Sequence, residues 1–196
     1  MTYYTLSDPC TATLEIKKSQ FLGFGFAIDS REQLMFHVEQ LRNQYPDARH
    51  VCYGYIIGDP HNTTSAGFDD DGEPSGTAGK PILNVLQHKG IGNCVVIVVR
   101  YFGGIKLGAG GLTRAYSSSA QAVVDNMNLH EFVPLSVILI ETDFANESFV
   151  RHTLDGFNAT ILQVDYGKNV VLTVELAQKS VQALSEKIGF YGTVKA

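Results

Sequence analysis

Two glycine-rich stretches hold the residues of this 196-residue chain that are best suited to chemistry. The later stretch, residues 100–116 (RYFGGIKLGAGGLTRAY), follows an apolar run and opens a segment with the composition of a helix. Free backbone amides at a helix N-terminus form an anion site, because the helix dipole places partial positive charge there. Lys106 and Arg114 can add charge-assisted hydrogen bonds to a phosphate. The stretch therefore predicts an anion site, and a tight strand-to-helix turn is the alternative interpretation.

Known catalytic and nucleotide-binding motifs do not match this stretch. A Walker P-loop needs GK[ST] after its glycines, and the dinucleotide fingerprint needs a ribose-binding acid, whereas the next acid here is Asp125. The serines at positions 117–119 lack the GxSxG elbow. Because no nucleophile has a recognisable base, we predict no catalytic residue and no cofactor, and we expect a binding protein rather than an enzyme.

Charge is distributed unevenly around the two stretches. No acidic residue occurs between Glu73 and Asp125, although five basic residues lie there: Lys80, Lys89, Arg100, Lys106 and Arg114. Basic side chains are rarely buried unpaired, so these must be solvated, pair with distant carboxylates, or bind an anion. The net charge of −5 argues against nucleic-acid binding by the whole surface. A local anion site is the prediction that fits both observations.

The earlier stretch, residues 69–81 (DDDGEPSGTAGKP), begins with a cluster of acids. Its weak candidates for a Mg²⁺ site are Asp69, Asp70, Asp71 and Glu73. The spacing does not match an EF-hand, and adjacent aspartates in a loop usually point in different directions. Solvated carboxylates, or partners for nearby arginines, are therefore the favoured interpretation. Thr77 or Ser75 is expected to cap the helix that follows.

The candidate ligand-binding set combines cations, glycines and aromatic side chains. The aromatic side chains of Tyr101, Phe102 and Tyr116 can stack on a base, although at least one of them is equally expected to pack in the core. His50 can titrate near neutrality, but a lone histidine before a strand is more often structural. The complete set is Arg49, His50, Thr77, Lys80, Arg100, Tyr101, Phe102, Gly103, Gly104, Lys106, Gly108, Gly110, Gly111 and Arg114.

Hydrophobic periodicity predicts the elements that position these residues. In the first part, strands are expected over 11–17, 21–28 (an opening hairpin), 51–57 and 94–99. The last of these is apolar throughout and should be a central strand covered on both faces. Ser30 and Pro46 delimit a helix, further helices are expected over 81–87 and 112–127, and residues 58–79 are expected to be mostly loop.

The remainder alternates strands and helices in the order βαββαβ, which is the ferredoxin-like unit. The expected elements are strands 133–141, 159–164, 170–176 and 191–194, with helices 146–154 and 179–188. Residues 130–134 should join two domains, 1–130 and 131–196, in an α+β protein. The oligomeric state is not predicted.

The composition limits the classes of protein to which the chain can belong. With 44% hydrophobic residues the chain should fold, and no apolar run approaches the roughly 20 residues of a membrane span. The N-terminus lacks the pattern of a signal peptide. The cysteines Cys10, Cys52 and Cys94 form no CxxC pattern, so buried reduced thiols are expected. These features indicate an unexported, cytoplasmic protein without a membrane partner.

Three blocks resemble the signature of the IMPACT/YigZ-like family: residues 46–50 (PDARH), 69–81 and 98–116. The resemblance implies that the N-terminal domain has the fold of the second domain of a small-subunit ribosomal protein. It also implies a C-terminal ferredoxin-like domain that resembles those of elongation factor G. Eukaryotic relatives regulate translation by competing for an activator of a stress-responsive initiation-factor kinase.

Three hypotheses for the function follow. The leading one is a non-enzymatic regulator of translation that binds RNA, the ribosome or a translation-associated protein through the glycine-rich basic site. The second is an enzyme that binds a nucleotide or phosphorylated substrate there, with Mg²⁺ at the acidic cluster. The third is a protein-binding adaptor that uses the loop of residues 69–81.

Overall fold

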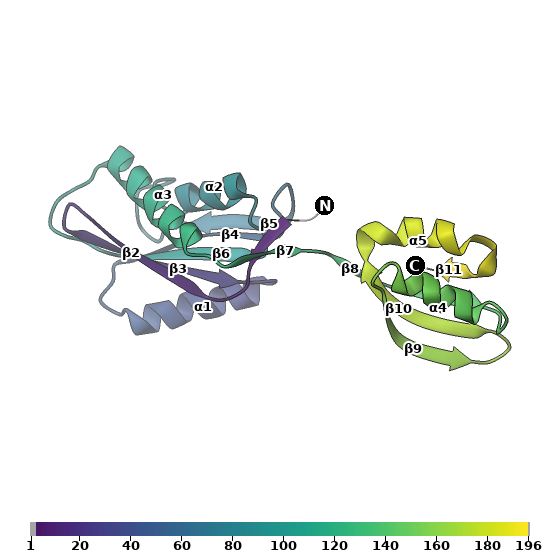
Figure 1. Ribbon diagram of the computed structural model, residues 1–196. Coiled ribbons are helices and arrows are strands. Elements are labelled where there is room, and N and C mark those ends of the chain that lie inside the picture. The colour runs from purple at the N-terminus through teal and green to yellow at the C-terminus, as the bar shows by residue number, and fades with distance from the viewer. Residues whose placement is uncertain (1–2, 196) are drawn as a thin grey trace. The chain divides into compact units, whose positions relative to one another are not determined.

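The computed structural model describes residues 3–195 and divides into two compact units, with the division between Phe132 and Val133. The first unit is built on a five-stranded antiparallel sheet (Figure 1). In spatial order its strands are β2 (Cys10–Ile16), β3 (Ser19–Ala27), β6 (Cys94–Tyr101), β4 (His50–Asp59) and β5 (Asn62–Asp69). The predicted opening hairpin is β2–β3, and the apolar β6 is the middle strand of the sheet.

Helices cover both faces of this sheet, as Figure 1 shows. The helices are α1 (Arg31–Gln44) on one face, and α2 (Gly79–Lys89) and α3 (Ala109–Asp125) on the other. Alternate residues of β6 enter the two hydrophobic clusters: Val96 and Val98 pack with α2 and α3, and Val95 and Ile97 pack with α1. This alternation confirms that β6 is covered on both faces and explains its apolar sequence.

Helix α1 begins as the sequence indicates. The Ser30 hydroxyl accepts from the backbone N–H of Gln33 at 3.4 Å. The reciprocal bond of the Gln33 side chain goes to the backbone N–H of Asp29, at 3.0 Å, and not to Ser30 itself. Both bonds satisfy amides at the helix entrance, which is the physical role of a capping box.

The prediction that residues 58–79 are mostly loop is wrong, because β5 occupies Asn62–Asp69. This strand lies at the edge of the sheet and most of its residues are exposed, so it lacks the apolar alternation that signals a half-buried strand. Ladder bonds to β4 form it instead. A short pair, β1 (Tyr3–Leu6) with β7 (Leu129–Phe132), was also not predicted, and β7 includes part of the expected join at 130–134.

The second unit confirms the ferredoxin-like prediction. Its elements are β8 (Leu135–Thr142), α4 (Glu147–Asp155), β9 (Thr160–Tyr166), β10 (Val170–Ala177), α5 (Val181–Ile188) and β11 (Thr193–Lys195), with short 3₁₀ turns at Gln178–Ser180 and Gly189–Tyr191. The antiparallel strands lie in the order β11-β8-β10-β9, which is that of a βαββαβ unit. Every second residue of β10 is buried in a core formed with α4 and α5.

None of the helices within residues 3–195 combines the length and the apolar character that a membrane-spanning helix needs.

Candidate anion-binding site

A pocket of about 360 Å³ lies in the first unit, where the end of β6 meets the start of α3. The segment before β4 and the loop after β5 complete its wall. Its lining residues are Arg49, His50, Glu73, Pro74, Arg100, Phe102, Lys106, Leu107, Gly108, Ala109 and Leu112. Both glycine-rich stretches of the sequence therefore contribute to one site.

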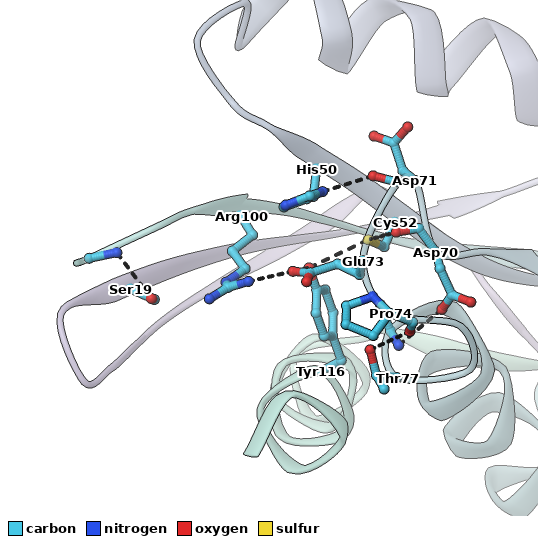
Figure 2. Close-up of polar contacts among 12 residues, drawn as sticks. Ser19, His50, Cys52, Asp70, Asp71, Glu73, Pro74, Thr77, Arg100 and Tyr116 are labelled. Carbon is cyan, nitrogen blue, oxygen red and sulfur yellow. Dashed lines mark hydrogen bonds and ion pairs between the residues drawn. The ribbon is translucent and has the colours of Figure 1, made fainter. Parts of the chain in front are cut away.

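A buried ion pair forms part of the pocket wall. Arg100 Nη1 donates to Glu73 Oε1 at 2.5 Å, and only 5% of Arg100 and 8% of Glu73 are exposed (Figure 2). The Tyr116 hydroxyl donates to the same carboxylate oxygen at 2.9 Å. Burial raises the pKa of Tyr116 well above its usual range, so the phenol stays protonated and acts as a donor. The Glu73 carboxylate thus balances the charge of Arg100, which would otherwise be buried alone.

The β6 strand presents Arg100 to this face of the sheet. Because side chains alternate along a strand, Arg100 points to the side of α2 and α3, as Val98 does, and Tyr101 packs with the α1 cluster on the opposite side. The Arg100 guanidinium carbon lies 5.5 Å from the ring centre of Phe21 and 5.7 Å from that of Phe102. Among the described residues its Nε has no hydrogen-bond partner.

The loop between β6 and α3 is fixed where it leaves the strand. The Gly103 backbone N–H donates to the Ser19 hydroxyl at 3.1 Å (Figure 2). A β-carbon on Gly103 would lie 2.0 Å from the carbonyl atoms of Lys18, so the backbone contact requires glycine here. The turn between β2 and β3 therefore positions the glycine loop.

Helix α3 begins at the pocket without a side-chain cap. Gly108 is its N-cap, with φ of 71°, and no side chain of the described chain accepts from the first-turn amides. Leu112 N is the first to bond within the helix, to Gly108 O at 2.9 Å. The amides of residues 109–111 are therefore available to a ligand at the positive end of the helix dipole.

The acidic loop stabilises its own fold. The Asp70 carboxylate accepts from the backbone N–H groups of Gly76, Ala78 and Gly79 at 2.7 to 3.0 Å and so caps α2 from a distance. The prediction that Thr77 or Ser75 caps this helix is wrong: the N-cap residue is Ala78, and the Thr77 hydroxyl donates to Pro74 O at 2.6 Å instead. An acid nine residues before Gly79 outcompetes the local hydroxyls because it reaches several amides at once.

Asp71 holds the start of β4. Its Oδ2 accepts from Val51 N at 2.6 Å, its Oδ1 pairs with Arg42 at 2.7 Å, and its backbone carbonyl lies 2.8 Å from His50 Nδ1. Because a carbonyl can only accept, Nδ1 carries a proton, and neutral His50 keeps Nε2 as its acceptor. The remaining aspartate, Asp69, accepts from Asp71 N at 2.7 Å.

The four carboxylates therefore point to different partners, and no group of three potential metal ligands occurs within residues 3–195. Cys52, on β4 beside this loop, adds no nucleophile. Cys52 Sγ lies within hydrogen-bond distance of Asp70 O at 3.0 Å and the Tyr116 hydroxyl at 3.4 Å. Burial raises the pKa of this thiol well above its usual range, so it stays protonated.

Six members of the predicted set line the pocket: Arg49, His50, Arg100, Phe102, Lys106 and Gly108. Arg114 is exposed one turn into α3, with Nη1 3.9 Å from the position of a β-carbon on Gly110. Gly104 and Gly110 are exposed, Gly111 is half-buried, and Lys80 is exposed on α2. Tyr101 and Thr77 are directed elsewhere by the contacts described above.

Sequence reasoning missed several lining residues. Pro74, Leu107, Ala109 and Leu112 were not predicted, and Glu73 was considered only as a metal ligand or an arginine partner. A signal for Glu73 was present, because it is the last acid before the acid-free stretch and Arg100 is a charge at the end of an apolar strand. The apolar lining residues carry no comparable signal.

Comparison with known proteins agrees with the fold. The Impact N-terminal domain family matches residues 17–124, which include all three motif blocks and more than half of the chain. The chain belongs to the IMPACT family. A domain of unknown function, DUF1949, matches residues 140–189 of this IMPACT protein, within the ferredoxin-like unit.

Two relatives and one solved structure match this chain over most of its length and of their own. "IMPACT family member YigZ" of Escherichia coli (strain K12) is 36% identical over 180 residues, which is 92% of this chain and 88% of the relative. An "IMPACT family member" of Haemophilus influenzae is 33% identical, over 89% and 84% of the two chains. A crystal structure of a hypothetical protein is 32% identical with a TM-score of 0.72, and covers 100% of this chain and 97% of that one.

Proposed function

We propose that this IMPACT protein is a non-catalytic, translation-associated protein that binds RNA phosphates in the pocket at the start of α3. The observation that carries the proposal is the convergence of Arg49, Lys106 and the uncapped helix N-terminus on one cavity. Donors from side chains and a helix dipole together favour an anion. The single carboxylate among the described lining residues, Glu73, is already neutralised by Arg100.

Two further features support RNA as the source of the phosphate. Phe102 lines the pocket with 48% of its surface exposed, so its ring is accessible for stacking on a base. The IMPACT family also includes eukaryotic members with a role in translation, as the resemblance implies. A regulator of translation would meet RNA at high local concentration on the ribosome.

A small phosphorylated molecule is the second candidate ligand. The volume of about 360 Å³ falls in the range of about 300–1,000 Å³ that is typical of small-ligand sites. His50 lines the same pocket and keeps Nε2 as an acceptor in its neutral form, which would supply a base. An enzyme of this kind would bind a mononucleotide more tightly than an RNA strand.

Fluorescence anisotropy with a labelled single-stranded RNA tests the proposal. We expect Lys106→Ala and Arg49→Ala each to weaken binding about tenfold, because each removes one charge-assisted hydrogen bond. Each should also reduce the slope of log affinity against log salt by about 0.7. Lys89→Ala is the matched control, because Lys89 is exposed at the far end of α2 and does not line the pocket.

Two results would contradict the proposal. One is the lack of salt-dependent RNA binding by the unaltered protein. The other is an equal loss of affinity in Lys89→Ala and Lys106→Ala, which would show general charge attraction instead of a site.

A further inference from the structure

The buried guanidinium of Arg100 has a free hydrogen-bond donor beside the anion pocket. The residue is 95% buried, since 5% of its surface is exposed, and its Nε has no partner among the described residues. Figure 2 shows one terminal nitrogen of Arg100 directed to Glu73 while the other points away from that carboxylate. Because Nε itself is shielded from solvent, the terminal nitrogen that points away from Glu73 (Figure 2) is the donor left for a ligand oxygen, and its bond would add to those of the exposed cations.

The donors around the pocket outnumber the oxygens of an internal phosphate. The amides of residues 109–111 are uncapped at the start of α3, and Arg100, Arg49 and Lys106 add side-chain donors. A phosphodiester in an RNA strand has two non-bridging oxygens and one negative charge. A phosphate monoester has three terminal oxygens, all of them strong acceptors. The arrangement of donors therefore suits the end of a chain better than its interior.

The charge of the lining residues leads to the same ligand. Arg49, Arg100 and Lys106 contribute three positive charges and Glu73 one negative charge, which leaves an excess of two. A phosphate monoester carries about −1.5 to −2 at pH 7, whereas each phosphodiester carries −1. A dianion thus neutralises the net charge of two on the described lining residues, and a monoanion leaves one positive charge unbalanced.

We infer that the pocket selects a phosphate monoester, such as a terminal phosphate of RNA, over an internal phosphodiester. The inference rests on the proposed anion site and specifies its ligand. Glu73 and Tyr116 are positioning residues in this arrangement, because they fix the guanidinium of Arg100 through bonds of 2.5 and 2.9 Å to one carboxylate oxygen. The terminal nitrogen of Arg100 that points away from Glu73 (Figure 2), together with the α3 amides, contacts the monoester.

Three RNAs of one sequence test the inference by fluorescence anisotropy. One carries a 5′-phosphate, one a 3′-phosphate, and one only hydroxyl ends, with the dye always at the opposite end. We expect at least one phosphorylated RNA to bind about tenfold or more tightly than the hydroxyl form, since a terminal phosphate adds one to three charge-assisted bonds. Adenosine monophosphate and inorganic phosphate, added as competitors, distinguish a free ligand from an RNA end.

Variants assign any preference to the pocket. Arg49→Gln should abolish most of the discrimination between phosphorylated and hydroxyl RNA, and Lys89→Ala should retain it. Arg100→Lys keeps the charge but removes the second terminal nitrogen, so it should reduce the preference while circular dichroism shows a folded protein. If Arg100→Lys unfolds, the Arg49→Gln result alone decides.

The outcomes separate this inference from the proposed function. Equal affinity for all three RNAs, with no competition by the monophosphate, overturns the inference and leaves RNA binding intact. Binding of adenosine monophosphate without binding of any RNA supports the monoester site and contradicts the RNA proposal. If neither RNA nor monophosphate binds, both proposals are wrong.

Discussion

Replacement of Glu73 by glutamine removes the charge that balances a buried arginine while it keeps the side-chain volume. The carboxylate accepts from Arg100 at 2.5 Å and from Tyr116 at 2.9 Å, and both charged side chains of the pair are at most 6% exposed. Removal of one partner of a buried ion pair costs about 3–5 kcal/mol of the free energy of unfolding. We expect about 3 kcal/mol for Glu73→Gln, because the amide oxygen still accepts one hydrogen bond.

A double-mutant cycle separates this pairing from a general loss of packing. Arg100→Met alone leaves the Glu73 carboxylate with Tyr116 as its remaining partner and should cost about 3–5 kcal/mol. In the double variant neither charge is buried, so the loss should be smaller than the summed losses by at least about 2 kcal/mol. Arg42→Met is the control, because the Arg42–Asp71 pair has an arginine side chain that is 47% exposed and should contribute about 0–1 kcal/mol.

Hydrogen–deuterium exchange with mass spectrometry is the appropriate assay, because the chain has two compact units and no tryptophan. Peptides from β4 and β6 report the opening free energy of the first unit, and peptides from β10 serve as an internal reference in the second. A loss below about 1 kcal/mol in Glu73→Gln, or strictly additive losses in the cycle, would refute the view that Glu73 holds Arg100 as a buried pair.

Two further predictions concern the loop and the thiols. Gly103→Ala should destabilise the first unit by about 3 kcal/mol, since its β-carbon would lie 2.0 Å from Lys18 backbone atoms. Gly104→Ala should cost about 1–2 kcal/mol, from its φ of 86° alone. Urea unfolding followed by hydrogen–deuterium exchange measures both losses of stability, and equal losses would contradict the backbone contact at Gly103. Burial raises the pKa of Cys52 and of Cys94, so a thiol reagent at pH 8 should label half-buried Cys10 first. Peptide mass spectrometry measures the order of labelling, and faster labelling of Cys52 would contradict its burial.

Local pattern was enough for much of the fold. The apolar run of residues 94–99 predicted a strand covered on both faces, and β6 is the middle strand between two helical layers. The βαββαβ order of the second unit followed from periodicity alone. These features are predictable because each depends on the period and burial of a few neighbouring residues. The edge strand β5 was missed because its exposed sequence has no such period.

The glycine-rich site was partly predictable for the same reason. Glycines before a helix indicated an uncapped N-terminus, and α3 begins at Ala109 with Gly108 as its N-cap. Lys106 was selected as a cation within the glycine loop and Arg49 as a cation within the PDARH block, and both line the pocket. Sequence did not indicate that Phe102 faces the pocket while Tyr101 packs on the other side, because strand alternation separates the two but does not say which face carries the site.

Apart from β5 and the β1–β7 pair, the sequence by itself determined the strands, the helices and the glycine loop, since these depend on local backbone preferences and on alternation. Tertiary structure decided the partners of the charges. Glu73 meets Arg100 across 27 residues of sequence, and Asp70 caps α2 in preference to the nearer hydroxyl of Thr77. The Glu73–Arg100 contact exists because β4 lies between β5 and β6 in the sheet, which brings the acidic loop beside the end of β6. Strand order is a global property, and no local pattern of residues specifies it.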